Sequence, residues 1–239
     1  MNIALLTASG VGSRTGQDIP KQFIHVNNIP IIIYTLKAFQ DHPDIDEICV
    51  VILKGWEEIL LAYAKQFNIS KLKYVVIGGA SGQESIYNGL TEIKKYRNAE
   101  DVVLIHDGNR PMVDKRIIDE SIEVYKKHGN AVAAIPVTEV VFQLEKNNDD
   151  NSTHTLDRDL LLRTQTPHTY QLGEIIENYD LAREKGISNM AASCQLMNEL
   201  GKKSFFSAGS EKNLKITTID DLEIFKALLN SSNDDWIKE

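Results

Sequence analysis

Short apolar runs that alternate with segments of helical periodicity constrain the fold of this chain more than any other feature. The runs with the length of a buried strand are 3–6, 47–53, 73–77, 102–105 and 131–135. The segments that space apolar residues as a helix does are 31–39, 56–67, 84–97 and one that begins at Asp114. This alternation predicts an α/β fold with a doubly wound, mostly parallel sheet. In such sheets, ligands bind beyond the carboxyl ends of the strands.

Length and charge narrow the class of protein further. The 239 residues fit one α/β domain that spans 1–239 and buries a sizeable core. A net charge of −8 argues against a general nucleic-acid surface. Cys49 and Cys194 are too few for a disulfide framework. With no signal peptide and no apolar run of membrane-spanning length, we expect a cytoplasmic protein without nucleic-acid or membrane partners.

The segment 9–23, directly after the first predicted strand, is rich in glycine. Gly10, Gly12 and Gly16 can adopt positive φ and allow a ligand to approach the backbone. Free backbone N–H groups in such a turn form a concave anion site. A glycine-rich turn is also common in α/β proteins without phosphate ligands, so the glycines alone leave both interpretations open.

Two cations in the same loop favour a polyphosphate ligand. Arg14 presents a planar fork of donors, and Lys21 adds a compact positive charge. The loop matches neither the Rossmann fingerprint, because Pro20 and an extended stretch intervene, nor a Walker A loop, which ends in Gly-Lys-Ser/Thr. The residues that we expect at the nucleotide here are Ala8, Ser9, Gly10, Val11 and Gly12.

Two later segments add to this predicted nucleotide site. Gly79 and Ala80 lie in a second glycine turn, and Ser85 near a helix start can donate to a phosphate or serve as an ordinary helix cap. Asp107 ends a central strand, and a carboxylate at this place can hold ribose hydroxyls or a divalent ion. The alternative is that Asp107 pairs with Arg110 and braces the turn. We expect the neighbouring His106 to have a structural role.

Four motifs together resemble a known family. They are the pattern G-x-G-x-R-x-G-x-x-x-P-K-Q from Gly10, His-Asp-x-x-Arg-Pro at 106–111, Gln-Thr-Pro at 165–167, and the segment 213–218. In this order the chain resembles the sugar-phosphate nucleotidyltransferases, and most closely the cytidylyltransferases that act on methylerythritol phosphate or ribitol phosphate. The resemblance implies a Rossmann-like nucleotidyltransferase fold that transfers CMP from CTP to a polyol or sugar phosphate and releases pyrophosphate.

The resemblance also implies roles for particular residues. Arg14, Lys21 and Lys215 are the expected catalytic cations, which stabilise charge on the α-phosphate and on the leaving pyrophosphate. The expected acceptor-binding residues are Arg110, Val140, Arg158 and Thr166. Mg²⁺ is the expected cofactor, bound mainly through the CTP phosphates, and we assign no side chain as a metal ligand.

The segment 137–158 alternates loosely between polar and apolar residues on either side of a polar tip, and predicts a projecting β-hairpin. Because an isolated hairpin is marginally stable, we expect this arm to have a partner. In the family such an arm clasps the second subunit of a homodimer, and Arg158 by that resemblance reaches the acceptor phosphate. The alternative for Arg158 is an ordinary surface charge.

Departures from the family pattern lie mostly on the acceptor side. Val140 replaces the threonine of an Asp-Thr pair, Asn189-Met190 replaces a Thr-Asp pair, and Lys212 precedes the Asn-x-Lys motif. On the nucleotide side, Gly82 stands where relatives usually have arginine. This pattern favours the same reaction on a different acceptor, such as ribitol 5-phosphate or glycerol phosphate for a cell-surface polymer. It disfavours methylerythritol phosphate, which would place the protein in isoprenoid biosynthesis, but keeps it among the candidate acceptors. A nucleotidyltransferase for another base, or a non-catalytic nucleotide-binding homologue, remains the alternative.

Overall fold

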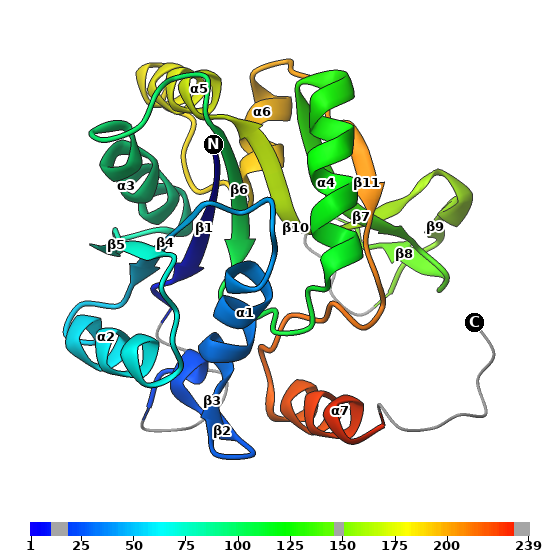
Figure 1. Ribbon diagram of the computed structural model, residues 1–239. Helices are drawn as coiled ribbons and strands as arrows, with labels where there is room; N and C mark the ends of the chain where they lie inside the picture. Colours follow the sequence, from blue (N-terminus) through cyan, green and yellow to red (C-terminus); the bar gives the residue numbers. More distant parts are fainter. Residues whose placement is uncertain (11–18, 146–150, 232–239) are drawn as a thin grey trace.

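A seven-stranded sheet forms the centre of the protein, in the order β11-β7-β10-β6-β1-β4-β5 (Figure 1). The computed structural model describes residues 1–10, 19–145 and 151–231. The strands are β1 (Asn2–Ala8), β4 (Glu47–Ile52), β5 (Leu72–Ile77), β6 (Val102–Asp107), β7 (Asn130–Pro136), β10 (Leu162–Gln171) and β11 (Phe206–Ala208). All neighbouring pairs are parallel except those that β10 makes with β6 and β7. The predicted doubly wound, mostly parallel α/β fold is therefore confirmed.

Helices cover both faces of this sheet (Figure 1). They are α1 (Ile31–Gln40), α2 (Glu57–Gln66), α3 (Gly82–Lys94), α4 (Lys115–His128), α5 (Leu172–Glu184), α6 (Ser193–Glu199) and α7 (Ile219–Asn230). The predicted cap at Asp114 is present, because its carboxylate accepts a 2.9 Å hydrogen bond from the Ile117 backbone. None of these described helices is both long enough and apolar enough to cross a membrane.

Side-chain alternation along the strands produces two cores. Ala4 and Leu6 of β1 face the core under α1, α2 and α4, whereas Ile3 and Leu5 face the core under α3, α5 and α6. All four side chains are fully buried. A near-continuous apolar run is what a strand buried on both faces requires, so the sequence predicted β1 well.

Two elements differ from the prediction. Strand β10 was not expected, because its sequence LRTQTPHTYQ is mostly polar and contains a proline. Its polar side chains find buried partners instead, as Thr169 does with Ser121 of α4 at 2.7 Å. The sequence also predicts a helix over about 189–200, whereas helix α6 begins at Ser193. Asn189 has a φ of +60°, which a right-handed helix does not allow.

The projecting arm is present. Strands β8 (Val141–Gln143) and β9 (His154–Leu156) pair antiparallel and extend away from the sheet beside β7 and β11 (Figure 1). The remaining short elements of the described residues are β2 (His25–Val26), β3 (Ile29–Pro30), and 3-10 helices at Lys21–Phe23 and Arg158–Leu160. On the arm, Val140, Phe142 and Leu144 are each more than half exposed.

Candidate active site

Parallel pairing of β1 with β6 brings the glycine loop and the Asp107 turn together. Thr7 of β1 lies opposite Asp107 of β6, so both strands end at the same edge of the sheet. A cavity of about 130 Å³ lies at this edge. Its lining residues are Thr7, Ala8, Ser9, Gly10, Lys21, Gln22, Asp107, Asn109 and Lys215. The structure thus brings Lys21 and Lys215, from opposite ends of the chain, to one cavity.

The Pro-Lys-Gln ending of the loop has a clear structural basis. Gln22 donates from Nε2 to the backbone carbonyl of Ala8 at 2.6 Å, and this ties the 3-10 helix to the end of β1. Phe23 is buried and stacks on Trp56 with ring centroids 4.5 Å apart. These anchors on one side of Lys21 hold that residue at the cavity.

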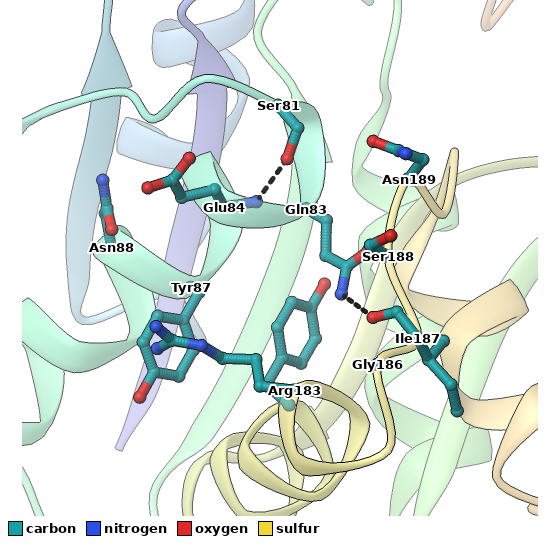
Figure 2. A pocket seen from close by; sticks show the side chains of 11 residues that line it. Ser81, Gln83, Glu84, Tyr87, Asn88, Arg183, Gly186, Ile187, Ser188 and Asn189 are labelled. Atoms are coloured by element: carbon teal, nitrogen blue, oxygen red, sulfur yellow. Dashed lines mark hydrogen bonds between the residues drawn. The ribbon is translucent and has the colours of Figure 1, made fainter.

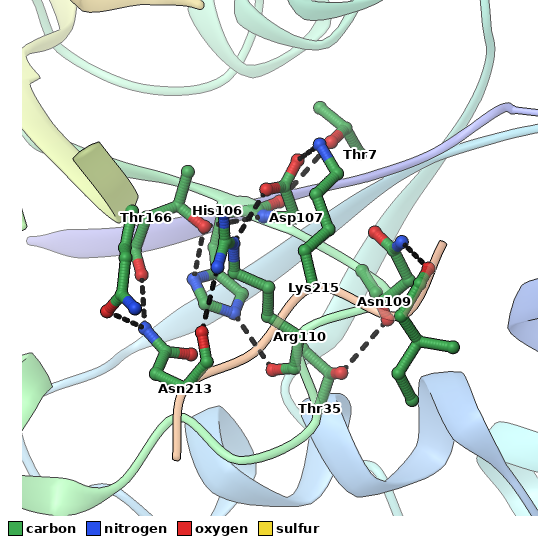
Figure 3. Close-up of polar contacts among 12 residues, drawn as sticks. Thr7, Thr35, His106, Asp107, Asn109, Arg110, Thr166, Asn213 and Lys215 are labelled. Atoms are coloured by element: carbon green, nitrogen blue, oxygen red, sulfur yellow. Dashed lines mark hydrogen bonds and ion pairs between the residues drawn. The ribbon is translucent and has the colours of Figure 1, made fainter. Parts of the chain in front are cut away.

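Asp107 is the electrostatic centre of the site (Figure 3). Its Oδ2 accepts from Nε of Arg110 and its Oδ1 accepts from Nζ of Lys215, both at 2.9 Å. Burial alone would raise the pKa of Asp107, but the charges of Lys215 and Arg110 outweigh burial and hold that pKa well below its usual range. The Asp107–Arg110 brace that the sequence left open is therefore present, and Lys215 is added to it.

A chain of hydrogen bonds fixes the turn after β6. The Asp107 backbone N–H donates to Oγ1 of Thr166 at 3.0 Å, and this hydroxyl lies 3.0 Å from Nδ1 of His106. Nε2 of His106 lies 3.2 Å from the Arg110 carbonyl, which can only accept a hydrogen bond, so Nδ1 is the acceptor for Thr166. Burial lowers the pKa of His106 to about 4. His106 is therefore a neutral structural residue, as expected.

Buried amides position the loop that carries Lys215. The Ile216 backbone N–H donates to the Asn109 carbonyl at 2.9 Å, and the Asn109 side chain donates to the Ile216 carbonyl. Asn213, which is fully buried, donates from Nδ2 to the Thr166 carbonyl at 3.0 Å. Arg110 completes the contact by donating to the Asn213 carbonyl at 2.8 Å (Figure 3). The loop is thereby fixed to both β6 and β10.

The second glycine turn contacts the first through serine hydroxyls. Oγ of Ser85 lies 3.0 Å from Oγ of Ser9 and accepts from the Gly79 backbone at 3.0 Å. The cap of α3 is Ser81, which accepts from the Glu84 backbone at 3.1 Å, so Ser85 is not that cap. The backbone N–H of Ala80 donates to the Glu84 carboxylate at 2.7 Å. Ser85 therefore joins the two loops expected at the nucleotide.

The expected acceptor residues fall into two groups. Arg110 and Thr166 line a cavity of about 210 Å³ on the β10 side of Asp107. The other lining residues are Thr7, Ile86, Ile105, His106, Asp107, Thr164, Gln165, His168, Ala191, Ala192, Ser193 and Lys215. Val140 and Arg158 lie on the arm and line neither of these two cavities. Arg158 is exposed and donates to the Thr138 carbonyl at 2.9 Å.

Other expected residues lie outside the described ranges, and one possible metal cluster lies elsewhere. Arg14, Val11 and Gly12 belong to the undescribed segment 11–18. His42, Asp44 and Asp119 approach closely enough to hold an ion. They lie near the start of β1, because Asn2 donates to the Asp44 carbonyl at 2.8 Å, so this cluster is at the opposite edge of the sheet from Asp107.

A larger cavity, of about 470 Å³, lies between α3 and the α5–α6 connection (Figure 2). The Arg183 guanidinium lies over the Tyr87 ring at 4.6 Å from its centroid. Gln83 crosses between the two elements, with Nε2 donating to the Ile187 carbonyl at 3.0 Å. Neither Lys21 nor Lys215 is among the described residues that line this cavity, so size alone does not identify the reactive centre.

Sequence reasoning missed several residues of the site. Gln22, Asn109, Gln165, His168 and Asn213 all line a cavity or hold its loops, and all are buried. A buried amide that bonds to backbone carbonyls leaves no periodic or charge signal. Gln22, Gln165 and Asn213 lie inside the sequence motifs, and this position was the only signal that pointed to them.

Comparison with known proteins agrees with this geometry. The sequence pattern of the family described as IspD: 2-C-methyl-D-erythritol 4-phosphate cytidylyltransferase matches residues 2–231. The ribitol-5-phosphate cytidylyltransferase of Lacticaseibacillus paracasei is 40% identical over 231 residues, which is 96% of this chain and 98% of the relative. The 2-C-methyl-D-erythritol 4-phosphate cytidylyltransferase of Clostridioides difficile is 36% identical over 238 residues, which is 99% of this chain and 97% of the relative.

Solved structures show the same fold. The crystal structure of the Francisella tularensis 2-C-methyl-D-erythritol 4-phosphate cytidylyltransferase matches with a TM-score of 0.77 and 30% identity, covering 95% of this chain and 98% of that one. Fold and relatives therefore define a nucleotidyltransferase of the CTP-dependent, cytidylyl-transferring class. The chain belongs to the IspD family.

Proposed function

We propose that this protein transfers CMP from CTP to ribitol 5-phosphate. The observation that carries the reaction is the convergence of Lys21, Lys215 and Asp107 on one cavity beside the glycine loop. The ribitol acceptor is supported by the relative from Lacticaseibacillus paracasei, at 40% identity. Val140, in place of an Asp-Thr threonine, also favours an acceptor other than methylerythritol phosphate.

In this reaction an oxygen of the acceptor phosphate attacks the α-phosphorus of CTP. A new P–O–P link forms, the bond from the α-phosphorus to the β-phosphate oxygen breaks, and pyrophosphate leaves with the bonding electrons. Lys21 and Lys215, with Arg14, neutralise charge on the α-phosphate and on the leaving group. The attacking phosphate is already ionised, so no general base is needed. Neutral His106 holds the turn.

Asp107 is the protein group that best fits Mg²⁺ in this site. Carboxylate oxygens suit this hard cation, and the Asp107 carboxylate borders both cavities. Both its oxygens bind cationic side chains here, so the triphosphate would supply most ligands. When bound, Mg²⁺ would supply positive charge that offsets the negative charge of the phosphates. Lys215 is 42% exposed and can exchange Asp107 for a phosphate.

We further propose a homodimer joined through the 137–158 arm of a single nucleotidyltransferase domain that spans 1–239. The support is the exposed apolar surface of the arm, where Val140 is 65% exposed and Phe142 is 58% exposed. In a dimer, Arg158 of one protomer would serve the acceptor site of the other. A cytoplasmic location fits two free, buried cysteines, Cys49 and Cys194.

Pyrophosphate release tests the proposed reaction directly. The four common nucleoside triphosphates, with Mg²⁺, are crossed against ribitol 5-phosphate, methylerythritol phosphate and glycerol 3-phosphate. We expect turnover with CTP and ribitol 5-phosphate; a preference for another base or another acceptor would contradict the proposal. Binding of CTP with no turnover on any acceptor would support a non-catalytic homologue.

Substitution of Lys21 links that activity to the site. Lys21→Ala should reduce turnover by at least about 100-fold, since removal of one preorganised donor to a developing charge has that effect. Lys126→Ala, at an exposed position near the end of α4, is the matched control and should leave turnover unchanged. Near-normal activity of the Lys21 variant would remove this lysine from the catalytic group.

A further inference from the structure

The cavity of about 210 Å³ on the β10 side of Asp107 has the size of a small acceptor. Sites for drug-sized ligands, a class that includes nucleosides, span roughly 300–1,000 Å³. The smaller cavity beside it holds the glycine loop and Lys21, which the triphosphate requires. The two cavities share Thr7, Asp107 and Lys215, so the reacting phosphates would meet there.

Most polar side chains in this cavity are already engaged with other protein groups. The Thr166 hydroxyl donates to His106, and Oγ of Ser193 lies 3.0 Å from the Tyr179 hydroxyl. Gln165 uses its amide on the backbone of Ser210, as donor at 2.8 Å and as acceptor at 3.1 Å. These groups hold the walls together, which leaves little hydrogen-bonding capacity for a substrate.

His168 differs from these residues. Its side chain lines the cavity and is only 2% exposed. His168 pairs in register with Ile105 of β6, whereas the Thr166 hydroxyl accepts from the backbone of Asp107 at the end of β6. His168 therefore lies two residues farther from that end of the strand than Thr166 does. The acceptor phosphate belongs near Lys215, and His168 is therefore placed for the part of the acceptor farthest from the phosphate.

The state of the ring determines what it can recognise. Burial lowers the pKa of His168 to about 4, so the imidazole is neutral in neutral solution. A neutral imidazole has one N–H donor and one nitrogen that accepts. One ring nitrogen of His168 forms a hydrogen bond with the Gln165 backbone, and this bond raises the pKa of the ring, as a bond to a carbonyl does. A carbonyl only accepts, so this nitrogen carries the N–H. None of the hydrogen bonds within the described residues engages the second nitrogen, which can therefore accept one.

We propose that His168 determines acceptor specificity by accepting a hydrogen bond from a distal hydroxyl of the acceptor's polyol chain. This inference rests on the proposed function, and it identifies how the same site selects its substrate. A buried acceptor that is satisfied only by a substrate hydroxyl discriminates strongly against an acceptor that lacks it, because the nitrogen is then left unpaired. Ribitol 5-phosphate has distal hydroxyls, and glycerol 3-phosphate, with a three-carbon chain, does not reach as far.

The test compares acceptors in His168 variants. His168→Leu removes the acceptor nitrogen, and His168→Gln restores an amide oxygen of similar reach. With ribitol 5-phosphate, His168→Leu should raise KM or lower kcat/KM by roughly tenfold or more, with partial recovery in His168→Gln. KM for CTP and the weaker turnover of glycerol 3-phosphate should stay within about twofold. His42→Leu, at a histidine that is also 2% exposed but lies at the opposite sheet edge, is the matched control and should affect both acceptors equally.

A measurement on the wild-type protein covers the case in which His168→Leu does not fold. With CMP bound, the ¹⁵N shifts of the His168 ring should move when ribitol 5-phosphate is added and stay in place with glycerol 3-phosphate. Equal loss for both acceptors, a raised KM for CTP alone, or unmoved ring shifts would overturn the inference while turnover of ribitol 5-phosphate still supports the proposed function. No wild-type turnover with ribitol 5-phosphate would overturn both.

Discussion

Replacing Thr166 with valine removes one hydroxyl group and nearly conserves the shape of the side chain. That hydroxyl accepts from the Asp107 backbone and donates to Nδ1 of His106, both at 3.0 Å. His106 is fully buried, so its nitrogen has no access to bulk water. The substitution therefore leaves the Asp107 backbone N–H and Nδ1 of His106 without partners, beside the carboxylate that binds Lys215.

The expected cost follows from the number of groups left unpaired. Each buried unsatisfied group costs about 1–3 kcal/mol, so the two groups unpaired by Thr166→Val should lower the free energy of unfolding by roughly 2–6 kcal/mol. Thr169→Val is the matched control on the same strand, because its hydroxyl bonds only to Oγ of Ser121 among the contacts described, at 2.7 Å. With one group unpaired, Thr169→Val should cost about 1–3 kcal/mol.

Urea unfolding measures both costs, and pyrophosphate release measures activity. Because Thr166 holds the Asp107 turn, Thr166→Val should lower kcat/KM by about tenfold or more, since 1.4 kcal/mol of lost positioning is tenfold. Thr169→Val should leave kcat/KM unchanged. A loss below about 0.5 kcal/mol in Thr166→Val, or equal loss of activity in the two variants, would refute the assigned hydrogen-bond chain.

Three further predictions follow from the same structure. Burial lowers the pKa of His106 and of His168 to about 4, so below pH 6.5 the unfolded chain binds more protons than the folded chain does. The free energy of unfolding should therefore fall by roughly 3 kcal/mol per histidine between pH 6.5 and pH 4. Urea unfolding that gives the same free energy across this pH range would contradict the prediction. Lys215→Met should lower kcat by about 100-fold or more, with Lys226→Met, on the exposed side of α7, unchanged in the same assay. Phe142→Asp should shift sedimentation from dimer to monomer, and an unchanged mass would remove the arm from the interface.

The parallel strands were predictable because burial on both faces selects apolar residues at every position. The run from Ile3 to Leu6 therefore indicates β1 without any knowledge of its neighbours. Strand β10 has no such signal, since Thr169 and His168 are buried through partners that lie far away in the sequence. Its position beside β6 depends on tertiary contacts that a local pattern does not contain.

The candidate site divides in the same way. Lys21, Asp107 and Lys215 were predicted from charge, glycine spacing and family motifs, and the structure brings them to one cavity. The pairing of Asp107 with Lys215 was not predicted, because it joins β6 to a loop more than a hundred residues later. The amides that position this loop, such as Asn213, act through backbone groups, which every residue shares.

Gly82 offers a test of whether the departure on the nucleotide side is functional. It begins α3 directly after the Ser81 cap, and a Cβ built there meets no atom within 4 Å, so a larger side chain fits. Arginine is usual at this position in the family. An exposed cation at this turn would attract the triphosphate by about 0–1 kcal/mol, which corresponds to a KM for CTP that is lower by at most about fivefold. Gly82→Ala is the control for backbone effects, since both substitutions remove the glycine but only one adds charge. One outcome is a KM for CTP that falls in Gly82→Arg but not in Gly82→Ala and rises again at high salt; this result would show that the turn can accommodate a phosphate contact that the natural chain lacks. Equal KM values in the two variants would place position 82 away from the phosphates.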